Sequence, residues 1–425
     1  MIKLIQEVIK EIPAITDYKI KAVTSSTYEL FYVLKELEVS RATDSTSYSV
    51  TIYTTVENQR GSTNITVHSF DTKEDLLESF KEGVENANSA LNPYYELVES
   101  APFENEEKQY DDDAKLASSI TEAVFNAKQY EQGWINSTEI FLTHQYIQMI
   151  NSKGINYGYN HFELLMEIIP TWQGEEEEVE LLDVYRSSVV DPAAIQEEVE
   201  DALENVKNRA IAKKIENKKV GVILQKGEAH RVFNSFANEG TYSQFYHHTN
   251  LYEVGDAIQK NASGDLLTIT ALPVIKNSIT SSPVDEDGII LQPLTIIEDG
   301  ILKHRWGTNQ LGQYLGETPT GNYRNIEVKA GKTSFKDMTL SPVLLVANMS
   351  GIQIERYSGY IGGEVRLGYY IDGDTVIPVT GLSITGNLNE MKNDMILSQE
   401  TCTSSGWSGC YGPKYILFKE GFKIG

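Results

Sequence analysis

The pattern of apolar and polar positions divides the chain into a first half that mixes helices with strands and a second half dominated by strands. Apolar residues at helical spacing predict an amphipathic helix over residues 2–12. Runs rich in β-branched and aromatic residues then predict strands at 27–33, 47–56 and 64–70. A second amphipathic pattern predicts a helix over 72–89. The chain therefore opens as helix, strands and helix.

Cap signals mark where several predicted helices begin. Asp71, followed three residues later by Glu74, predicts a capping box before helix 72–89. Asp111-Asp-Asp113 predicts the start of a helix over 114–131, because carboxylates stabilise the positive end of the helix dipole. Asp191-Pro192 predicts the start of the clearest helix of the chain, which is expected to end near Lys214.

Between these helices, residues 137–150 and 157–170 are predicted to form a strand pair. Asn151-Ser-Lys-Gly154 supplies the turn that a hairpin needs. A further strand is predicted over 179–185. The pattern favours a mainly antiparallel sheet in this half.

From Val220 onward, short apolar runs alternate with glycine-containing turns, and little helix is predicted after about residue 260. We expect an α+β protein of two domains. Residues 1–215 would form a mixed α/β domain, and residues 216–425 a β-rich domain with a large curved or barrel-like sheet.

Composition limits the partners and the location of the protein. The 425 residues carry 36 Lys and Arg against 61 Asp and Glu, a net charge of −25, which repels nucleic acid. No apolar run approaches the ~20 residues of a membrane span. Charges interrupt the apolar pattern of the first ten residues, so no signal peptide is expected and we predict a cytoplasmic protein. Cys402 and Cys410 are the two cysteines, too few for a disulfide framework.

The candidate chemistry lies just after a short apolar strand at 220–224. Glu228 and His230 follow that strand within a few residues, a placement in which a rigid scaffold presents side chains to a ligand. A histidine and a glutamate at the start of a helix suggest either a metal-binding catalytic helix or the remains of one.

Several segments of the second half, in their order along the chain, resemble those of the TldD/PmbA family of metalloproteases, which includes TldE and has been labelled as modulators of DNA gyrase. They are Pro283–Gly288, Thr295–Lys303, Thr318–Arg324, Gly359–Glu364, Tyr370–Val379, Ser383–Asn387 and Ser408–Gly412. Each segment alone is a weak turn motif, whereas their order over more than a hundred residues is specific. The resemblance implies an α+β first domain, a β-rich second domain, and a dimer that encloses a cavity for unfolded peptides.

The resemblance also implies a zinc site that this sequence does not reproduce. TldD-type members carry His-Glu-x-x-x-His, in which two histidines bind zinc, the glutamate activates water and a distant cysteine is the third ligand. Gly227 and Val232 stand at the two histidine positions, while Glu228 matches the glutamate and Cys410 the cysteine. His230 lies two residues after Glu228, off the helix face that the motif requires.

We therefore expect a TldE/PmbA-like subunit without its own zinc, forming a homodimer or a heterodimer with a TldD-type catalytic subunit. A divergent metallopeptidase with non-standard zinc ligands is one alternative, with His230, His247, His248, Asp256 and Cys410 as candidates. In a strand, the adjacent His247 and His248 would point to opposite faces. A peptide-binding or scaffold protein without proteolytic activity is the other alternative.

Peptide binding does not require zinc, because an exposed strand edge can pair with an extended peptide. Gly359, Gly362 and Gly363 are the predicted place for such a close approach of two backbones. The acidic charge of the chain would favour basic or neutral peptides over acidic ones.

Overall fold

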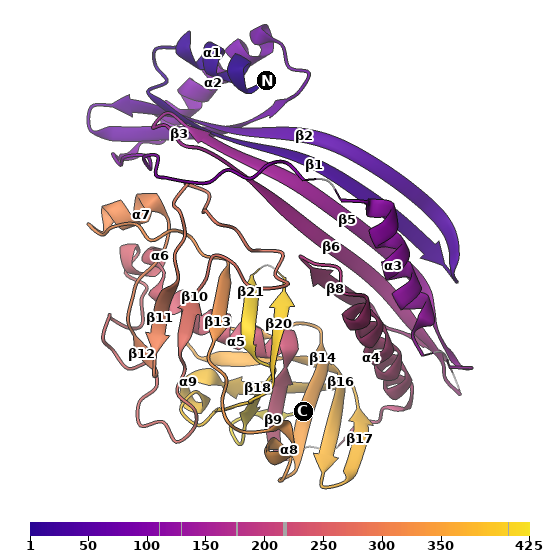
Figure 1. Ribbon diagram of the computed structural model, residues 1–425. Coiled ribbons are helices and arrows are strands. Elements are labelled where there is room, and N and C mark those ends of the chain that lie inside the picture. Colours follow the sequence, from indigo (N-terminus) through magenta and orange to yellow (C-terminus); the bar gives the residue numbers. More distant parts are fainter. Residues whose placement is uncertain (110, 129, 176, 216–218, 407) are drawn as a thin grey trace.

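The computed structural model describes residues 1–425 except 110, 129, 176, 216–218 and 407. Figure 1 shows one large curved sheet in the N-terminal half, with helices at both of its ends, and a strand-rich C-terminal half packed beneath it. The predicted domain boundary at 215/216 falls on residues outside the described part of the chain, so it stays a prediction.

The N-terminal sheet has eight strands in the order β4-β3-β2-β1-β5-β6-β7, with β8 also paired to β6. All of its pairs are antiparallel, and the long hairpin predicted around residues 151–154 is confirmed. The strands are β1 (Asp17–Val33), β2 (Glu36–Val56), β3 (Gln59–His68), β4 (Asn92–Pro93), β5 (Gly133–Asn151), β6 (Asn156–Gln173), β7 (Glu178–Glu180) and β8 (Asp183–Ser187).

Four helices cover one face of this sheet, because even-numbered residues of β1 supply apolar side chains to that face at both ends. Ile20 packs in the cluster that holds α1 and α2, and Leu30 packs in the cluster that holds α3 and α4. None of the helices in the described part of the chain has the length and apolar character of a membrane span. The helices are α1 (Ile2–Lys10), α2 (Lys73–Ser89), α3 (Asp113–Asn126) and α4 (Pro192–Ile211).

The helix starts confirm two cap predictions and correct a third. Asp112 accepts a hydrogen bond from a backbone N–H of α3, and Asp191 accepts two from α4. The capping box of α2 is formed by Thr72 and Asp75, one residue later than predicted. Asp71 instead accepts a hydrogen bond from the His68 backbone, which ends the preceding strand.

The C-terminal half is rich in strands, as predicted, but they form two open sheets rather than one large curved or barrel-like sheet. The large curved sheet belongs to the N-terminal half. The first C-terminal sheet has the order β12-β11-β10-β13-β21-β20. Its strands are β10 (Ile269–Ala271), β11 (Leu294–Glu298), β12 (Ile301–Leu302), β13 (Asn325–Val328), β20 (Thr401–Ser405) and β21 (Gly409–Pro413).

The second C-terminal sheet has nine strands in the order β19-β22-β9-β14-β16-β18-β23, with β15 and β17 also paired to β16. Those strands are β9 (Gly221–Gln225), β14 (Val343–Met349), β15 (Gln353–Ile354), β16 (Tyr360–Asp372), β17 (Thr375–Val379), β18 (Leu382–Asn387), β19 (Ile396–Leu397), β22 (Tyr415–Phe418) and β23 (Lys423–Ile424). The helices of this half are short: α5 (Lys226–Ala237), the 3-10 turn Asn238–Gly240, α6 (Tyr242–Tyr246), α7 (Asn309–Tyr314), α8 (Phe335–Met338) and α9 (Leu388–Met391).

The chain after β4 connects the two halves. Glu96 accepts hydrogen bonds at its carbonyl from Asn309 (2.7 Å) and Gln313 (2.8 Å) of α7, and the Tyr314 hydroxyl donates to the carbonyl of Pro93 (2.6 Å). This segment therefore joins the N-terminal sheet to the C-terminal half.

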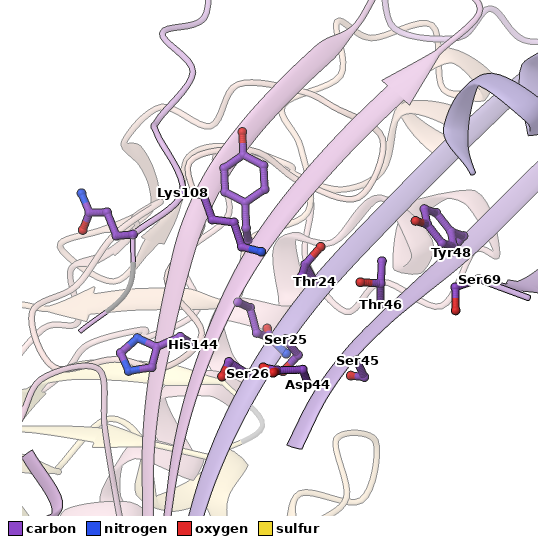
Figure 2. A pocket seen from close by; sticks show the side chains of 13 residues that line it. Thr24, Ser25, Ser26, Asp44, Ser45, Thr46, Tyr48, Ser69, Lys108 and His144 are labelled. Atoms are coloured by element: carbon purple, nitrogen blue, oxygen red, sulfur yellow. The ribbon is translucent and has the colours of Figure 1, made fainter. Parts of the chain in front are cut away.

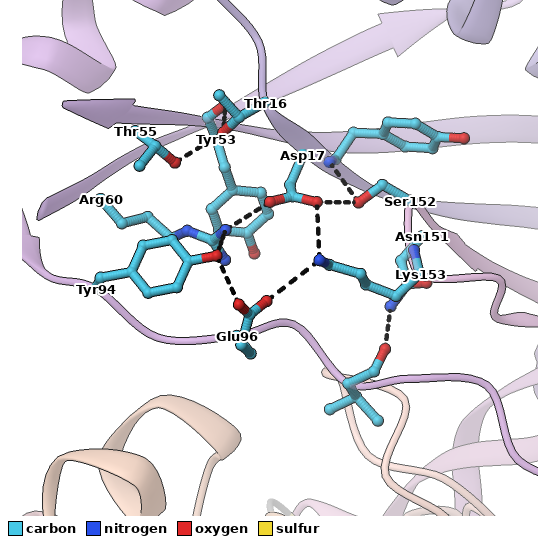
Figure 3. Close-up of polar contacts among 12 residues, drawn as sticks. Thr16, Asp17, Tyr53, Thr55, Arg60, Tyr94, Glu96, Asn151, Ser152 and Lys153 are labelled. Carbon is cyan, nitrogen blue, oxygen red and sulfur yellow. Dashed lines mark hydrogen bonds and ion pairs between the residues drawn. The ribbon is translucent and has the colours of Figure 1, made fainter. Parts of the chain in front are cut away.

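A buried ion pair anchors the same segment to the N-terminal sheet (Figure 3). Arg60 is 1% exposed, and its guanidinium donates to Asp17 at 2.5 Å. The rings of Tyr53, Tyr94 and Tyr95 lie 4.5–5.3 Å from its Cζ atom. These cation–π contacts, together with the carboxylate, offset the cost of burying the charge.

We predict that Arg60→Ala lowers the free energy of unfolding by about 3–5 kcal/mol, because it removes the buried guanidinium that donates to Asp17 and leaves this carboxylate with only the more distant Lys153 ammonium, at 4.0 Å. Denaturation in urea, followed by circular dichroism, measures this loss. Lys73→Ala is the matched control, since the Lys73–Glu11 pair is largely exposed and should contribute less than ~1 kcal/mol. Equal losses in the two variants would contradict the prediction.

Candidate functional site

The strand predicted at 220–224 is β9, which lies inside the nine-stranded sheet between β14 and β22. The chain turns from β9 directly into α5 at Lys226, whose φ of 45° lies in the left-handed region. The Lys226 backbone donates to the carbonyl of Lys414, and its ammonium pairs with Glu198 and Asp201. These contacts hold a sharp strand-to-helix junction just before Glu228.

Gly227, Glu228 and Val232, which align with the His-Glu-x-x-x-His motif, lie on α5 in different environments. Val232 is 0% exposed and packs in the main apolar core of the C-terminal half. A Cβ atom added at Gly227 would meet no heavy atom within 4 Å, so open space lies beside that position. Glu228 lies 3.7 Å from Arg231, and its Oε2 atom is buried without a hydrogen-bond partner among the described residues. Burial raises the pKa of the Glu228 carboxyl above its usual value.

His230 is 2% exposed and faces β20 of the other C-terminal sheet. Its Nδ1 atom forms a 2.5 Å hydrogen bond with the Ser404 hydroxyl, and its Nε2 atom lies 3.8 Å from the Cys402 sulfur. Burial lowers the pKa of the imidazole to about 4 and raises the pKa of the Cys402 thiol to about 11. Imidazole and thiol are therefore both neutral at pH 7, which makes Cys402 a poor nucleophile.

Cys410 lies on β21, beside β20, and is completely buried. Cys402 pairs with Gly412 and Cys410 with Ser404, so the two thiols are diagonal neighbours on one face of the hairpin. Both cysteines are free thiols, and burial raises the pKa of Cys410 well above its usual value. Within the described residues, no group of three or more His, Cys, Asp or Glu side chains is arranged to hold a metal ion.

Several of the other predicted site residues lie in ordinary turns. His247 and His248 follow α6 and are exposed, so the pair does not lie in a strand. Asp256 accepts a hydrogen bond from the Glu253 backbone at 2.9 Å. No hydrogen bond or ion pair in the described part of the chain joins these three residues to His230 or Cys410.

The three glycines predicted to border a peptide do not lie at an open strand edge. Gly362 on β16 pairs with Gln353 of β15 on one side and with Thr385 of β18 on the other. A Cβ atom at Gly362 would lie 2.6 Å from the carbonyl of Ile384, and one at Gly363 would lie 2.6 Å from the carbonyl of Gly351. These two glycines serve close packing of the chain on itself, whereas Gly359 has a φ of 75° in the turn before β16.

Sequence reasoning missed the buried polar residues that bring the resembling segments together. Asp285 is 5% exposed and accepts hydrogen bonds from the backbones of Asp287, Ile289 and Asn322, at 2.9–3.0 Å. Desolvation raises the pKa of its carboxyl to about 6. The sequence held one sign of this role: Asp285 directly follows Pro283 and Val284 in a turn that contains Gly288.

Asn325, the first residue of β13, also joins distant segments through its buried side chain. Its Oδ1 atom accepts hydrogen bonds from Ser278 and Thr280, both at 2.7 Å. A Cβ atom at Gly409 would lie 2.1 Å from that oxygen, so only glycine fits there without rearrangement. The segments 283–288, 318–324 and 408–412 therefore meet in one region, although 120 residues separate the first from the last.

A separate polar cavity of about 490 Å³ lies on the N-terminal sheet (Figure 2). His144 borders it and forms a 2.7 Å contact with Asp113 at the start of α3. The cavity is lined mainly by hydroxyl and amide side chains. Its lining residues are Thr24, Ser25, Ser26, Asp44, Ser45, Thr46, Tyr48, Ser69, Lys108, Gln109, His144, Gln145 and Tyr146.

Comparison with known proteins assigns the C-terminal half to a class of metallopeptidases. Residues 217–421 match the PmbA/TldA metallopeptidase C-terminal domain. The chain is 26% identical over 205 residues to a metalloprotease PmbA homolog of Haemophilus influenzae, covering 46% of this chain and 45% of that protein. It is 27% identical over 207 residues to a metalloprotease TldD homolog of Buchnera aphidicola, covering 45% and 41%. The matches thus span less than half the length of these curated relatives.

Solved structures extend the likeness to the whole fold. TldE from Thermococcus kodakarensis superposes with a TM-score of 0.81 at 16% identity, covering 100% of this chain and 99% of that one. A protein of Thermotoga maritima, described as a modulator of a DNA gyrase, gives a TM-score of 0.76 at 14% identity, covering 100% and 98%. Residues 217–421 belong to the PmbA/TldD family of metallopeptidase C-terminal domains, which confirms the resemblance found in the sequence.

The structure predicts that His230 stays uncharged through the neutral and mildly acidic range. Its pKa of about 4 lies below the unfolded value of 6.5, so the neutral form is favoured by folding. The corresponding stability is present above about pH 6.5 and is lost as the pH falls towards 4. An NMR titration of the histidines, assigned with His230→Asn, measures this pKa. A midpoint near 6.5 for His230 would show that the imidazole is not buried as described.

Proposed function

We propose that this chain is a TldE/PmbA-like subunit of a peptide-processing metalloprotease, that it lacks a zinc site of its own, and that it acts in the cytoplasm. The observation that carries the proposal is the environment of Val232. This residue stands where TldD-type members have a zinc-binding histidine, yet its side chain is fully buried in the apolar core. A histidine that binds zinc there would need a polar opening in that core.

The remaining motif residues support the same reading. Gly227 has no side chain to offer, and Glu228 keeps a buried Oε2 atom without a hydrogen-bond partner in the described part of the chain. In zinc peptidases such a glutamate acts on a metal-bound water. Without both histidines, the glutamate has no activated water to deprotonate, and the residues present do not fit a TldD-type zinc site.

Peptide contact remains available at a different strand edge from the one predicted. β20 is the terminal strand of its sheet, and among the described residues it pairs with β21 alone. β20 and β21 both pack against α5, the helix that carries Glu228. An extended peptide could add to this edge by backbone pairing, with little dependence on sequence.

Two other functions make different predictions. A divergent metallopeptidase would have to assemble a new site from His230, Cys402 and Cys410, of which the first two approach within 3.8 Å. Metal binding would deprotonate the thiols, so a high thiol pKa in the free protein does not exclude it. A scaffold without a proteolytic role would bind peptides but would have no catalytic partner.

We predict that the purified chain contains no stoichiometric zinc and that Cys410→Ser leaves this unchanged. Elemental analysis after purification without added metal measures it, with Val184→Ser on exposed β8 as a matched surface control. Stoichiometric zinc that disappears only in Cys410→Ser would overturn the zinc-free proposal and establish the divergent peptidase.

We further predict that the chain forms a heteromer with a TldD-type protein carrying an intact His-Glu-x-x-x-His from the same genome. Light scattering of the mixture should show the complex. Cleavage of an unfolded peptide should require the mixture and should be lost when the partner's motif glutamate is replaced by glutamine. Full proteolysis by either protein alone would contradict the assignment of a supporting role.

A further inference from the structure

A cleft of about 170 Å³ lies between the two halves of the molecule. The N-terminal sheet contributes Ile147 and Met149 of β5, and the C-terminal half contributes Leu291. These side chains form an apolar wall. The other walls come from segments 283–288 and 318–324, so the cleft lies where the two halves and the resembling segments meet.

Basic side chains gather at this cleft, which is unusual for a chain with a net charge of −25. Lys21 of β1, His161 of β6 and Arg324 beside β13 all line it. Burial, together with the positive charges of Arg324 and Lys21 in the same cleft, lowers the pKa of His161. Like charges held near one another are costly unless an anion joins them.

Lys21 has no hydrogen bond or ion pair within the part of the chain that the structure describes. Its neighbour on the same face of β1, Lys19, shows the contrast. Lys19 donates to Asp287 at 2.9 Å, so its positive charge is paired with a carboxylate of the same chain. Lys21 therefore presents a cation to the cleft without an internal carboxylate bound to it.

The two acidic residues of the cleft, Asp285 and Glu286, form no ion pair with Lys21 in the described part of the chain. Asp285 is occupied by three backbone N–H groups, so its oxygens are already engaged. Glu286 is exposed and also borders a second cavity beside Lys21 and Lys19. The negative charge of Glu286 opposes anion binding, because it reduces the net positive charge of the cleft.

We propose that this cleft binds the C-terminal carboxylate of an extended peptide, which deepens the proposed function by naming the end of the substrate that this subunit holds. Lys21 and Arg324 would face the carboxylate, and the last side chain would lie against Ile147 and Met149. A carboxylate forms strong, charge-assisted hydrogen bonds with such cations. The small volume suits a chain end, and a polyanion would be repelled by the net charge of the whole protein.

The test compares two peptides of one sequence, each labelled at its N-terminus, one with a free C-terminal carboxylate and the other with a C-terminal amide. Fluorescence anisotropy with the full chain measures both dissociation constants. We expect the free acid to bind about tenfold more tightly, equivalent to ~1.4 kcal/mol.

Three variants make the test specific to the cleft. Lys21→Gln should reduce the ratio of the two dissociation constants towards one, and Glu286→Gln, which removes the opposing charge, should increase it. Lys81→Gln removes one positive charge from the exposed surface of α2 and should leave the ratio unchanged. Circular dichroism confirms that each variant is folded.

The outcomes separate this proposal from the proposed function on which it rests. Equal binding of acid and amide by the native chain would overturn the carboxylate site and leave peptide binding intact. An unchanged ratio in Lys21→Gln, or tight binding of an amidated peptide that ends in glutamate, would also overturn it. Failure of both peptides to bind would overturn this proposal together with peptide binding by the subunit.

Discussion

The carboxylate of Asp285 is the contact on which the arrangement of the two halves depends. By accepting hydrogen bonds from the backbones of Asp287, Ile289 and Asn322, it ties two distant loops together. Asp287 is thereby positioned to accept from Lys19 of the N-terminal sheet and from the backbone of Asn309. Because an unpaired buried carboxylate is costly, this geometry is strongly favoured over alternatives that leave its oxygens without donors.

The helix α5 and the cleft between the two halves differ in polarity. α5 carries Glu228, whose Oε2 atom is buried, and packs Val232 into the apolar core of the C-terminal half. The cleft between the halves presents Lys21, whose side chain has no hydrogen bond or ion pair among the described residues.

The neutral cluster of His230, Ser404 and Cys402 shows how burial decides chemistry. In water, an imidazole beside a thiol can form a thiolate–imidazolium pair, which is the reactive form of many cysteine enzymes. Here desolvation moves the pKa of His230 down and that of Cys402 up, so charge separation is disfavoured. The cluster instead links α5 to β20 by hydrogen bonds between neutral groups.

The sequence by itself determined the elements with strong local signals: the long hairpin at residues 151–154, the helix that Asp191 caps, the strand before Glu228, and the family. Local signals suffice there because periodicity, turns and caps act over a few residues. Only the tertiary structure decided which sheet is large and curved, that Gly362 lies inside a sheet, and that His230 meets Cys402, 172 residues away. Strand partners and side-chain burial depend on long-range packing, and no pattern along a single strand records its neighbours.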